Sequence, residues 1–101
     1  MSSVWTVLIH PLVFTEDLKR LDPSAQQEIL PTLRKRLFLD PKAYGKPLGG
    51  ELAGLWRLRV GDYRAIYRIV EDRVEVLILK IGIRRDFEVY RQMVQRLKRL
   101  L

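Results

Sequence analysis

The chain has 101 residues, 48% of them hydrophobic, and a formal net charge of +7. This length fits one domain with a modest core, and the lack of cysteine excludes disulfides and cysteine-ligated metals. No apolar run is long enough for a transmembrane helix, and no signal peptide is recognisable, so we expect a cytoplasmic protein. Arginine supplies 13 of the 19 basic residues, which favours a nucleic acid or an acidic protein as partner.

The first residues of the chain predict a strand followed by a short helix. Residues 4–9 are rich in β-forming side chains, and a His-Pro pair ends this strand. Phe14, Leu18 and Leu21 then recur at helical spacing, so a short helix should bury them. The charged residues of this helix should lie outside: Glu16, Asp17, Lys19 and Arg20. His10 lies at a strand end beside a proline, where a lone histidine is more often structural than catalytic.

A second helix should begin after Asp22, which is a suitable cap, and end at Asp40-Pro41. Its apolar positions have helical spacing: Ile29, Leu33 and Leu37. Pro31 lies inside this pattern, so we expect it to kink or interrupt the helix. Residues 41–54 follow, are rich in glycine and proline, and predict a loop.

Residues 55–69 form two alternating runs around Gly61-Asp62, which predicts a β-hairpin with a two-residue turn. Pairing across the turn places Trp56 opposite Tyr67 and Arg59 opposite Arg64. Because side chains alternate between faces, one face of the hairpin should be a core. That face carries Trp56, Leu58, Val60, Tyr63, Ala65, Tyr67 and Ile69. The other face should expose Arg57, Arg59, Arg64 and Arg68, with Leu55 and Ile66 among them.

The arginines of the hairpin point to a bound anion. Like charges directly opposite each other, as at Arg59 and Arg64, destabilise a hairpin unless something neutralises them. Arginine also suits bidentate contact with phosphate. The sequence therefore predicts a polyanion site on this face. The alternative, a surface charged only for solubility, explains scattered charges better than a cluster.

The last third of the chain predicts a strand and a helix. A second turn near Glu71-Asp72 leads to a strand over residues 73–81, and a simple register places Arg68 opposite Glu75. This strand is apolar on both faces, so both should be covered. Gly82 breaks it. A C-terminal amphipathic helix should then bury Val89, Met93 and Leu97 and expose Arg91, Arg96, Lys98 and Arg99.

The element order β-α-α-β-β-β-α predicts an α+β fold in a single domain, residues 1–101. The sheet should be twisted and mostly antiparallel. Two N-terminal helices should pack on one face, and a C-terminal helix completes the domain.

Four runs of the chain resemble the RelE toxins of type II toxin–antitoxin systems: residues 46–48, 54–67, 80–85 and 88–90. The most specific of them is the Leu-Trp-Arg-Leu-Arg-Val-Gly-Asp-Tyr-Arg run that begins at Leu55. The resemblance spans nearly the whole chain. It marks the RelE/ParE superfamily strongly and separates its two branches less sharply.

The resemblance implies a RelE-like fold and a ribosome-dependent mRNA endonuclease that needs no metal or other cofactor. In such an enzyme the RNA 2′-hydroxyl attacks the adjacent phosphate, leaving a 2′,3′-cyclic phosphate and a 5′-hydroxyl. By position, the catalytic set is Arg57, Arg59, Arg64, Arg84 and Tyr90. We expect further RNA contacts from Arg68, Arg85 and Lys46.

The roles follow from the chemistry of each side chain. Arg57 and Arg64 should bind the scissile phosphate, and Arg59 should position or weakly deprotonate the 2′-hydroxyl. Arg84 should face the leaving oxygen, and Tyr90 should stack or orient a base. Arginine is a poor general base because its pKa is above about 12, and Ile83 stands where many relatives carry histidine. Charge stabilisation and alignment should therefore carry most of the rate.

The resemblance also implies partners. A cognate RelB-like antitoxin, small and folding on binding, should neutralise the chain, with Leu55 and Ile66 as exposed apolar contacts. The ribosome and mRNA should be the other partners, with no membrane. Two alternatives remain open: a ParE-like protein that inhibits DNA gyrase, and a basic RNA-binding domain that acts on the ribosome without cutting.

Overall fold

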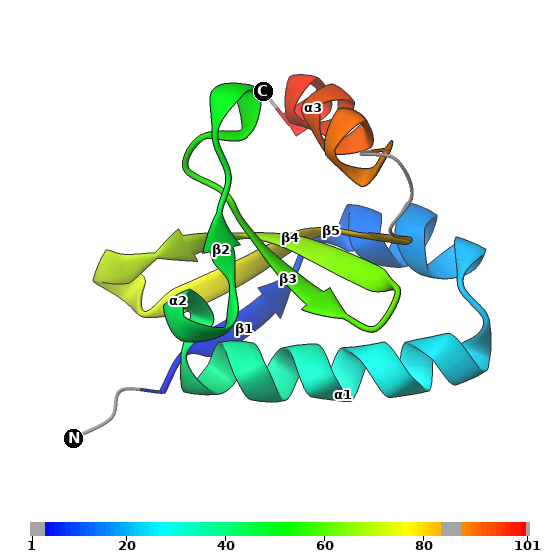
Figure 1. Ribbon diagram of the computed structural model, residues 1–101, viewed down its shortest axis with the longest axis horizontal. Helices are drawn as coiled ribbons and strands as arrows, with labels where there is room; N and C mark the ends of the chain where they lie inside the picture. The colour runs from blue at the N-terminus through cyan, green and yellow to red at the C-terminus, as the bar shows by residue number, and fades with distance from the viewer. Residues whose placement is uncertain (1–3, 84–87, 101) are drawn as a thin grey trace.

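The structure, a computed structural model, describes residues 4–83 and 88–100 as a five-stranded sheet with helices on both sides (Figure 1). The strands are β1 (Thr6–Ile9), β2 (Lys46–Pro47), β3 (Trp56–Val60), β4 (Tyr63–Val70) and β5 (Glu75–Ile83). Their order in the sheet is β1-β5-β4-β3-β2, with β1 parallel to β5 and every other pair antiparallel. The predicted α+β class and mostly antiparallel sheet are confirmed.

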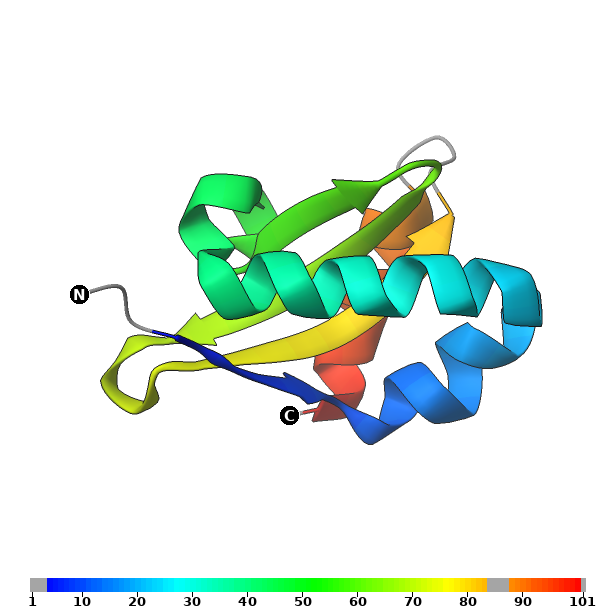
Figure 2. The same ribbon diagram turned by 90° about the horizontal axis from the view of Figure 1, so that it is seen from below.

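Helices cover both faces of the sheet. They are α1 (Pro23–Leu39), α2 (Pro41–Tyr44) and α3 (Glu88–Leu100). In Figure 1, α1 runs below the sheet and α3 lies above it, and Figure 2 shows α1 in front of the strands. Strand β5 lies between these layers, which agrees with its apolar residues on both faces.

The larger core lies between the sheet and α1. The hairpin has the predicted register, with Trp56 opposite Tyr67 and Arg59 opposite Arg64. Gly61 adopts a φ of 57°, which the predicted two-residue turn requires at its first position. The inward face of the hairpin packs on the apolar stripe of α1. This core includes Ile29, Leu33, Leu37, Leu58, Ala65 and Tyr67.

Helix α1 begins after Asp22, as predicted, although that side chain makes no capping hydrogen bond. The prediction that Pro31 would kink or interrupt this segment is wrong as to interruption, because α1 continues through it from Pro23 to Leu39. Pro31 lies on the exposed face of α1. The carbonyl that loses its helical partner there can instead be solvated.

The segment before α1 winds differently from the predicted α-helix. It forms a π-helical turn, η1 (Val13–Asp17), and a 3-10 turn, η2 (Leu18–Arg20). Because these turns have a different pitch from an α-helix, the buried positions shift. Phe14 is 48% exposed, whereas Val13 and Asp17 are buried. The predictions for Phe14 and Asp17 are therefore wrong, and those for Leu18 and Leu21 are confirmed.

The predicted loop over residues 41–54 contains more structure than expected. Asp40 ends α1 and caps α2, because its Oδ1 accepts hydrogen bonds from Lys42 N and Ala43 N at 3.2 and 3.1 Å. Strand β2 then pairs with β3, placing Lys46 opposite Arg57. A 3-10 turn, η3 (Gly50–Leu52), completes the segment.

A second core fills the space between the sheet and α3. It contains Leu52, Leu55, Ile66, Leu79, Val89 and Met93. Ile66 is 0% exposed and Leu55 is 7% exposed, so the prediction that both are accessible to an antitoxin is wrong. The physical reason is that α3 and η3 cover this part of the arginine-bearing face.

The connection between β4 and β5 also differs from the prediction. It takes four residues, a 3-10 turn η4 (Glu71–Arg73) followed by Val74 in a left-handed conformation. Glu75 therefore pairs with Val70, and Arg68 lies opposite Leu77 instead of Glu75. At its other end β5 continues through Gly82 to Ile83, so the prediction that Gly82 breaks the strand is wrong.

Candidate nucleic-acid interface

Three of the predicted site residues share one face of the β3–β4 hairpin. Arg59 and Arg64 are directly opposite each other in the register, and Arg57 lies two residues from Arg59 on the same strand. Because strand side chains alternate, all three belong to the face that α3 partly covers. Arg64 is buried, so the prediction that it is exposed is wrong, whereas Arg57 is half-buried and Arg59 is exposed. Exposure of the side chain therefore increases from Arg64 to Arg57 and then to Arg59.

Arg64 and Tyr90 form the centre of this face. The Arg64 Nη1 donates a hydrogen bond of 2.5 Å to the Tyr90 hydroxyl, and the guanidinium carbon lies 5.3 Å from the centroid of the tyrosine ring. Such a contact combines a charge-assisted hydrogen bond with a cation–π interaction. Tyr90 comes from the first turns of α3, so that helix brings the aromatic ring to the hairpin.

Lys46 and Arg68, which were predicted to make further RNA contacts, differ in their position relative to the hairpin arginines. Lys46 is exposed and lies opposite Arg57 in the β2–β3 pairing, which extends the basic face across the sheet. Arg68 is exposed but lies four residues from Arg64 along β4, roughly 13 Å at the usual rise of a strand. The structure thus groups Lys46 with the hairpin arginines and separates Arg68 from Arg64.

Two predicted site residues, Arg84 and Arg85, lie outside the described residues. Among the described ones, His10 has a local contact: its Nδ1 accepts a hydrogen bond of 3.1 Å from Leu12 N. That bond satisfies a backbone donor at the start of the helical turns, in agreement with the structural role predicted for His10.

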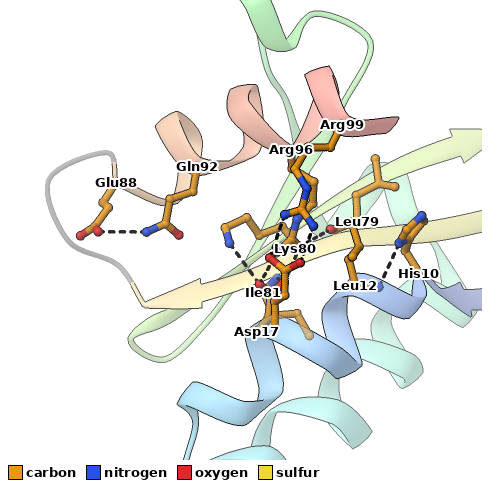
Figure 3. Close-up of polar contacts among 11 residues, drawn as sticks. His10, Leu12, Asp17, Leu79, Lys80, Ile81, Glu88, Gln92, Arg96 and Arg99 are labelled. Atoms are coloured by element: carbon orange, nitrogen blue, oxygen red, sulfur yellow. Dashed lines mark hydrogen bonds and ion pairs between the residues drawn. The ribbon is translucent and has the colours of Figure 1, made fainter. Parts of the chain in front are cut away.

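A buried ionic cluster went unrecognised in the sequence. It consists of Asp17, Lys80 and Arg96, which we call the Asp17 cluster (Figure 3). All three are 4% exposed, so the prediction that Arg96 lies outside is also wrong. The only sequence signal for it is a lysine inside an apolar strand, because buried charges in proteins are normally paired. Burial lowers the pKa of Lys80, although Asp17 opposes that shift.

Glu16 and Arg99 extend the Asp17 cluster toward solvent. The Arg99 Nη2 donates to the Glu16 Oε2 at 2.7 Å, and its Nη1 donates to Oε1 at 3.0 Å. The hydrogen-bonded Arg99 guanidinium lowers the pKa of Glu16 from 4.5 to about 2.

We expect Glu16→Gln to lower the melting temperature slightly at neutral pH, because the pair lies at the surface. A carboxylate with a lowered pKa stabilises the fold above its unfolded-state value of 4.5 and loses that effect as the pH falls toward about 2. Thermal unfolding followed by circular dichroism over this range measures the difference. Glu28→Gln, at an exposed site on α1, is the control. A Glu16→Gln deficit that does not shrink with falling pH would contradict the assignment.

Two further properties bear on the chemistry. Within residues 4–83 and 88–100, no group of three or more His, Cys, Asp or Glu side chains is placed to hold a metal ion. No helix in the same part of the chain combines the length and the apolar character that crossing a membrane requires. The face around Arg64 carries the guanidinium groups of the hairpin and the phenol of Tyr90, and such groups can bind phosphates and stack a base.

Comparison with known proteins identifies relatives over most of the chain. A family model described as "ParE toxin of type II toxin-antitoxin system, parDE" matches residues 8–86. Toxin RelG of Mycobacterium tuberculosis is 37% identical over 76 residues, covering 75% of this chain and 85% of RelG. Toxin RelE of the same organism is 35% identical over 66 residues, covering 65% of this chain and 68% of that toxin.

A solved structure agrees with these matches. The toxin–antitoxin complex RelBE2 from Mycobacterium tuberculosis contains a chain that is 34% identical, with a TM-score of 0.76. The match covers 82% of this chain and 94% of the chain in the complex. Both the sequence matches and the shared fold lead to one assignment: this chain belongs to the RelE/ParE family of toxins of type II toxin–antitoxin systems.

Proposed function

We propose that this toxin cuts mRNA on the ribosome and is held inactive by a RelB-like antitoxin. The observation that carries the proposal is the pairing of Arg59 opposite Arg64 with Tyr90 bound to Arg64. This pairing gathers positive charge on one face of the hairpin, which favours a function that binds an anion there. A phosphate of RNA is the anion that two guanidinium groups bind well.

An unsatisfied donor supports the same conclusion. Among the described residues, the buried Nε of Arg64 has no hydrogen-bond acceptor, although Nη1 is used by Tyr90. A buried donor without an acceptor costs free energy, and among the described residues the Nε of Arg96 in the Asp17 cluster is a second such donor. A phosphate oxygen would satisfy it with a charge-assisted hydrogen bond.

In the proposed reaction the RNA supplies its own nucleophile. The 2′-hydroxyl loses its proton and attacks the adjacent phosphorus, the bond from phosphorus to the 5′-oxygen breaks, and that oxygen takes up a proton to leave as a 5′-hydroxyl while a 2′,3′-cyclic phosphate forms. Arg57 and Arg64 stabilise the negative charge that develops on the phosphate, Arg59 orients the 2′-hydroxyl, and Tyr90 stacks or orients a base. Arg84 is proposed to face the leaving oxygen. The ribosome would hold the mRNA in the in-line geometry that this attack requires.

The antitoxin is supported by a relative. The RelBE2 structure is described as a toxin–antitoxin complex, and the present chain has a net charge of +7. We expect an antitoxin with an acidic segment that folds on binding.

Induction of the toxin in a bacterial host tests the proposed activity. We expect translation to stop and 5′-hydroxyl ends to appear within translated regions of mRNA, with co-expressed antitoxin restoring growth. The alternative, inhibition of DNA gyrase, is favoured by the family description, which names ParE. Gyrase-dependent double-strand breaks without mRNA cuts would establish that alternative and refute the proposal.

A further inference from the structure

Helix α3 is attached to the sheet by apolar contacts along its centre and by polar contacts on its two flanks. Val89 and Met93 are buried in the second core. Tyr90 and Arg96 are six residues apart, which places them about 120° apart around the helix axis at about 100° per residue. Tyr90 contacts Arg64 on one flank, and Arg96 contacts Asp17 on the other.

The contact on the Arg96 flank is dense. Asp17 accepts hydrogen bonds of 2.7 Å from both Arg96 Nη1 and Nη2, and one of 3.1 Å from Lys80 Nζ. It also accepts one of 2.9 Å from Ile81 N, while Arg96 Nη1 donates to Leu79 O at 2.8 Å. Asp17 and Arg96 thus serve two backbone groups of β5 beyond the end of β1. Figure 3 shows the Asp17 carboxylate between the helical turns, β5 and α3.

These hydrogen bonds constrain the rotation of α3 about its axis more tightly than the apolar contacts do. Burial of Val89 and Met93 is non-directional, so it sets no donor–acceptor geometry on the flanks of α3. A bidentate arginine–carboxylate pair fixes distance and angle. Side-chain tips lie roughly 5–6 Å from a helix axis, so a rotation of about 20° would move them by about 2 Å. That displacement would break the bond of 2.5 Å between Tyr90 and Arg64.

Helix α3 packs so closely on the sheet that such a displacement would reach the surroundings of Arg64. Gly82 is the register partner of Arg64 on β5. A Cβ atom at Gly82 would lie 2.9 Å from Val89 Cγ2, so α3 packs directly on the backbone next to Arg64. The helix therefore has little room to move without changing the surroundings of Arg64.

We infer that the Asp17 cluster, made of Asp17, Lys80 and Arg96, fixes the rotation of α3 and so holds Tyr90 against Arg64. They are positioning residues, because they act on RNA through Tyr90. The inference deepens the proposed function and rests on it only for the activity measurement. Loss of the Asp17 cluster should slow cleavage by about a hundredfold, since a misplacement of even about 1 Å can cost that much.

The test uses Asp17→Asn, which removes the charge and keeps the shape of the side chain. Arg96→Lys is the second variant, since it keeps a charge and loses the bidentate fork. Asp22→Asn is the matched control, because Asp22 is exposed and its side chain makes no capping hydrogen bond. NMR of ¹³C-labelled tyrosine rings reports position independently of activity. The chain has four tyrosines, and Tyr90→Phe identifies the signal of Tyr90.

In folded Asp17→Asn and Arg96→Lys proteins we expect the NMR signal of Tyr90 to shift and that of the buried Tyr67 to stay. Single-turnover mRNA cleavage on ribosomes should slow. The control should match the wild type. An unmoved Tyr90 signal in both variants of the Asp17 cluster would overturn the inference, and so would a shifted signal with an unchanged cleavage rate. If the signal shifts but the wild type itself does not cut mRNA, the proposed function is wrong, and the positioning of Tyr90 by the Asp17 cluster is still supported.

Discussion

Replacing Arg64 with alanine should slow mRNA cleavage about a hundred- to thousandfold, equivalent to about 2.7–4 kcal/mol of transition-state stabilisation. Arg64 is the buried arginine of the basic face and is fixed by Tyr90 through a bond of 2.5 Å. A charge held in place before the reaction stabilises the transition state without reorganisation, so its loss should appear in the rate of the chemical step. Single-turnover cleavage on programmed ribosomes measures that step.

Two companions make the Arg64 result interpretable. Arg73→Ala removes an exposed arginine from η4, at the far end of β4, and should leave the rate unchanged. Arg64→Lys keeps a charge but loses the fork, so we expect an intermediate rate. Because Arg64 is buried, each variant is checked by circular dichroism and thermal unfolding. A folded Arg64→Ala protein that cuts at the wild-type rate would remove Arg64 from the site.

Replacing Ile66 with alanine should destabilise the fold by about 2–5 kcal/mol, the usual cost of truncating a fully buried isoleucine. Ile66 is 0% exposed and packs in the second core beneath α3. The loss arises from the transfer of buried carbon to water and from the cavity that remains. The midpoint of urea unfolding at constant m-value measures it.

Ile83→Ala is the matched control for Ile66, since Ile83 ends β5 and is 41% exposed. We expect a change within about 0.5 kcal/mol for this surface position. Equal losses for the two variants would contradict the second core and would return Ile66 to the accessible surface that the sequence predicted for it.

The features that the sequence predicted correctly are local ones. The two-residue turn at Gly61-Asp62 sets the register of the hairpin, and the alternation of side chains then places Arg59 opposite Arg64. Both depend on residues that are near one another in the chain. The stripe Ile29, Leu33 and Leu37 likewise identifies the buried face of α1 from its own period.

The features that the sequence did not predict depend on distant segments. The period of α3 shows that it is amphipathic but not that it covers Ile66. The buried position of Asp17 depends on Lys80 and Arg96, which lie 63 and 79 residues away. The π-helical turn that carries Asp17 changes the periodicity on which helix prediction relies. The family resemblance singled out Tyr90, and only the structure shows its bond to Arg64.

The most direct test of the proposed site is the chemistry of the RNA ends that the purified wild-type toxin leaves on programmed ribosomes. We predict cuts in mRNA on the ribosome that yield a 2′,3′-cyclic phosphate and a 5′-hydroxyl, without added metal, because in the proposed reaction the RNA provides the nucleophile and Arg57, Arg59 and Arg64 stabilise and orient it. Intact mRNA on those ribosomes, together with inhibition of purified gyrase by the same preparation, would contradict it.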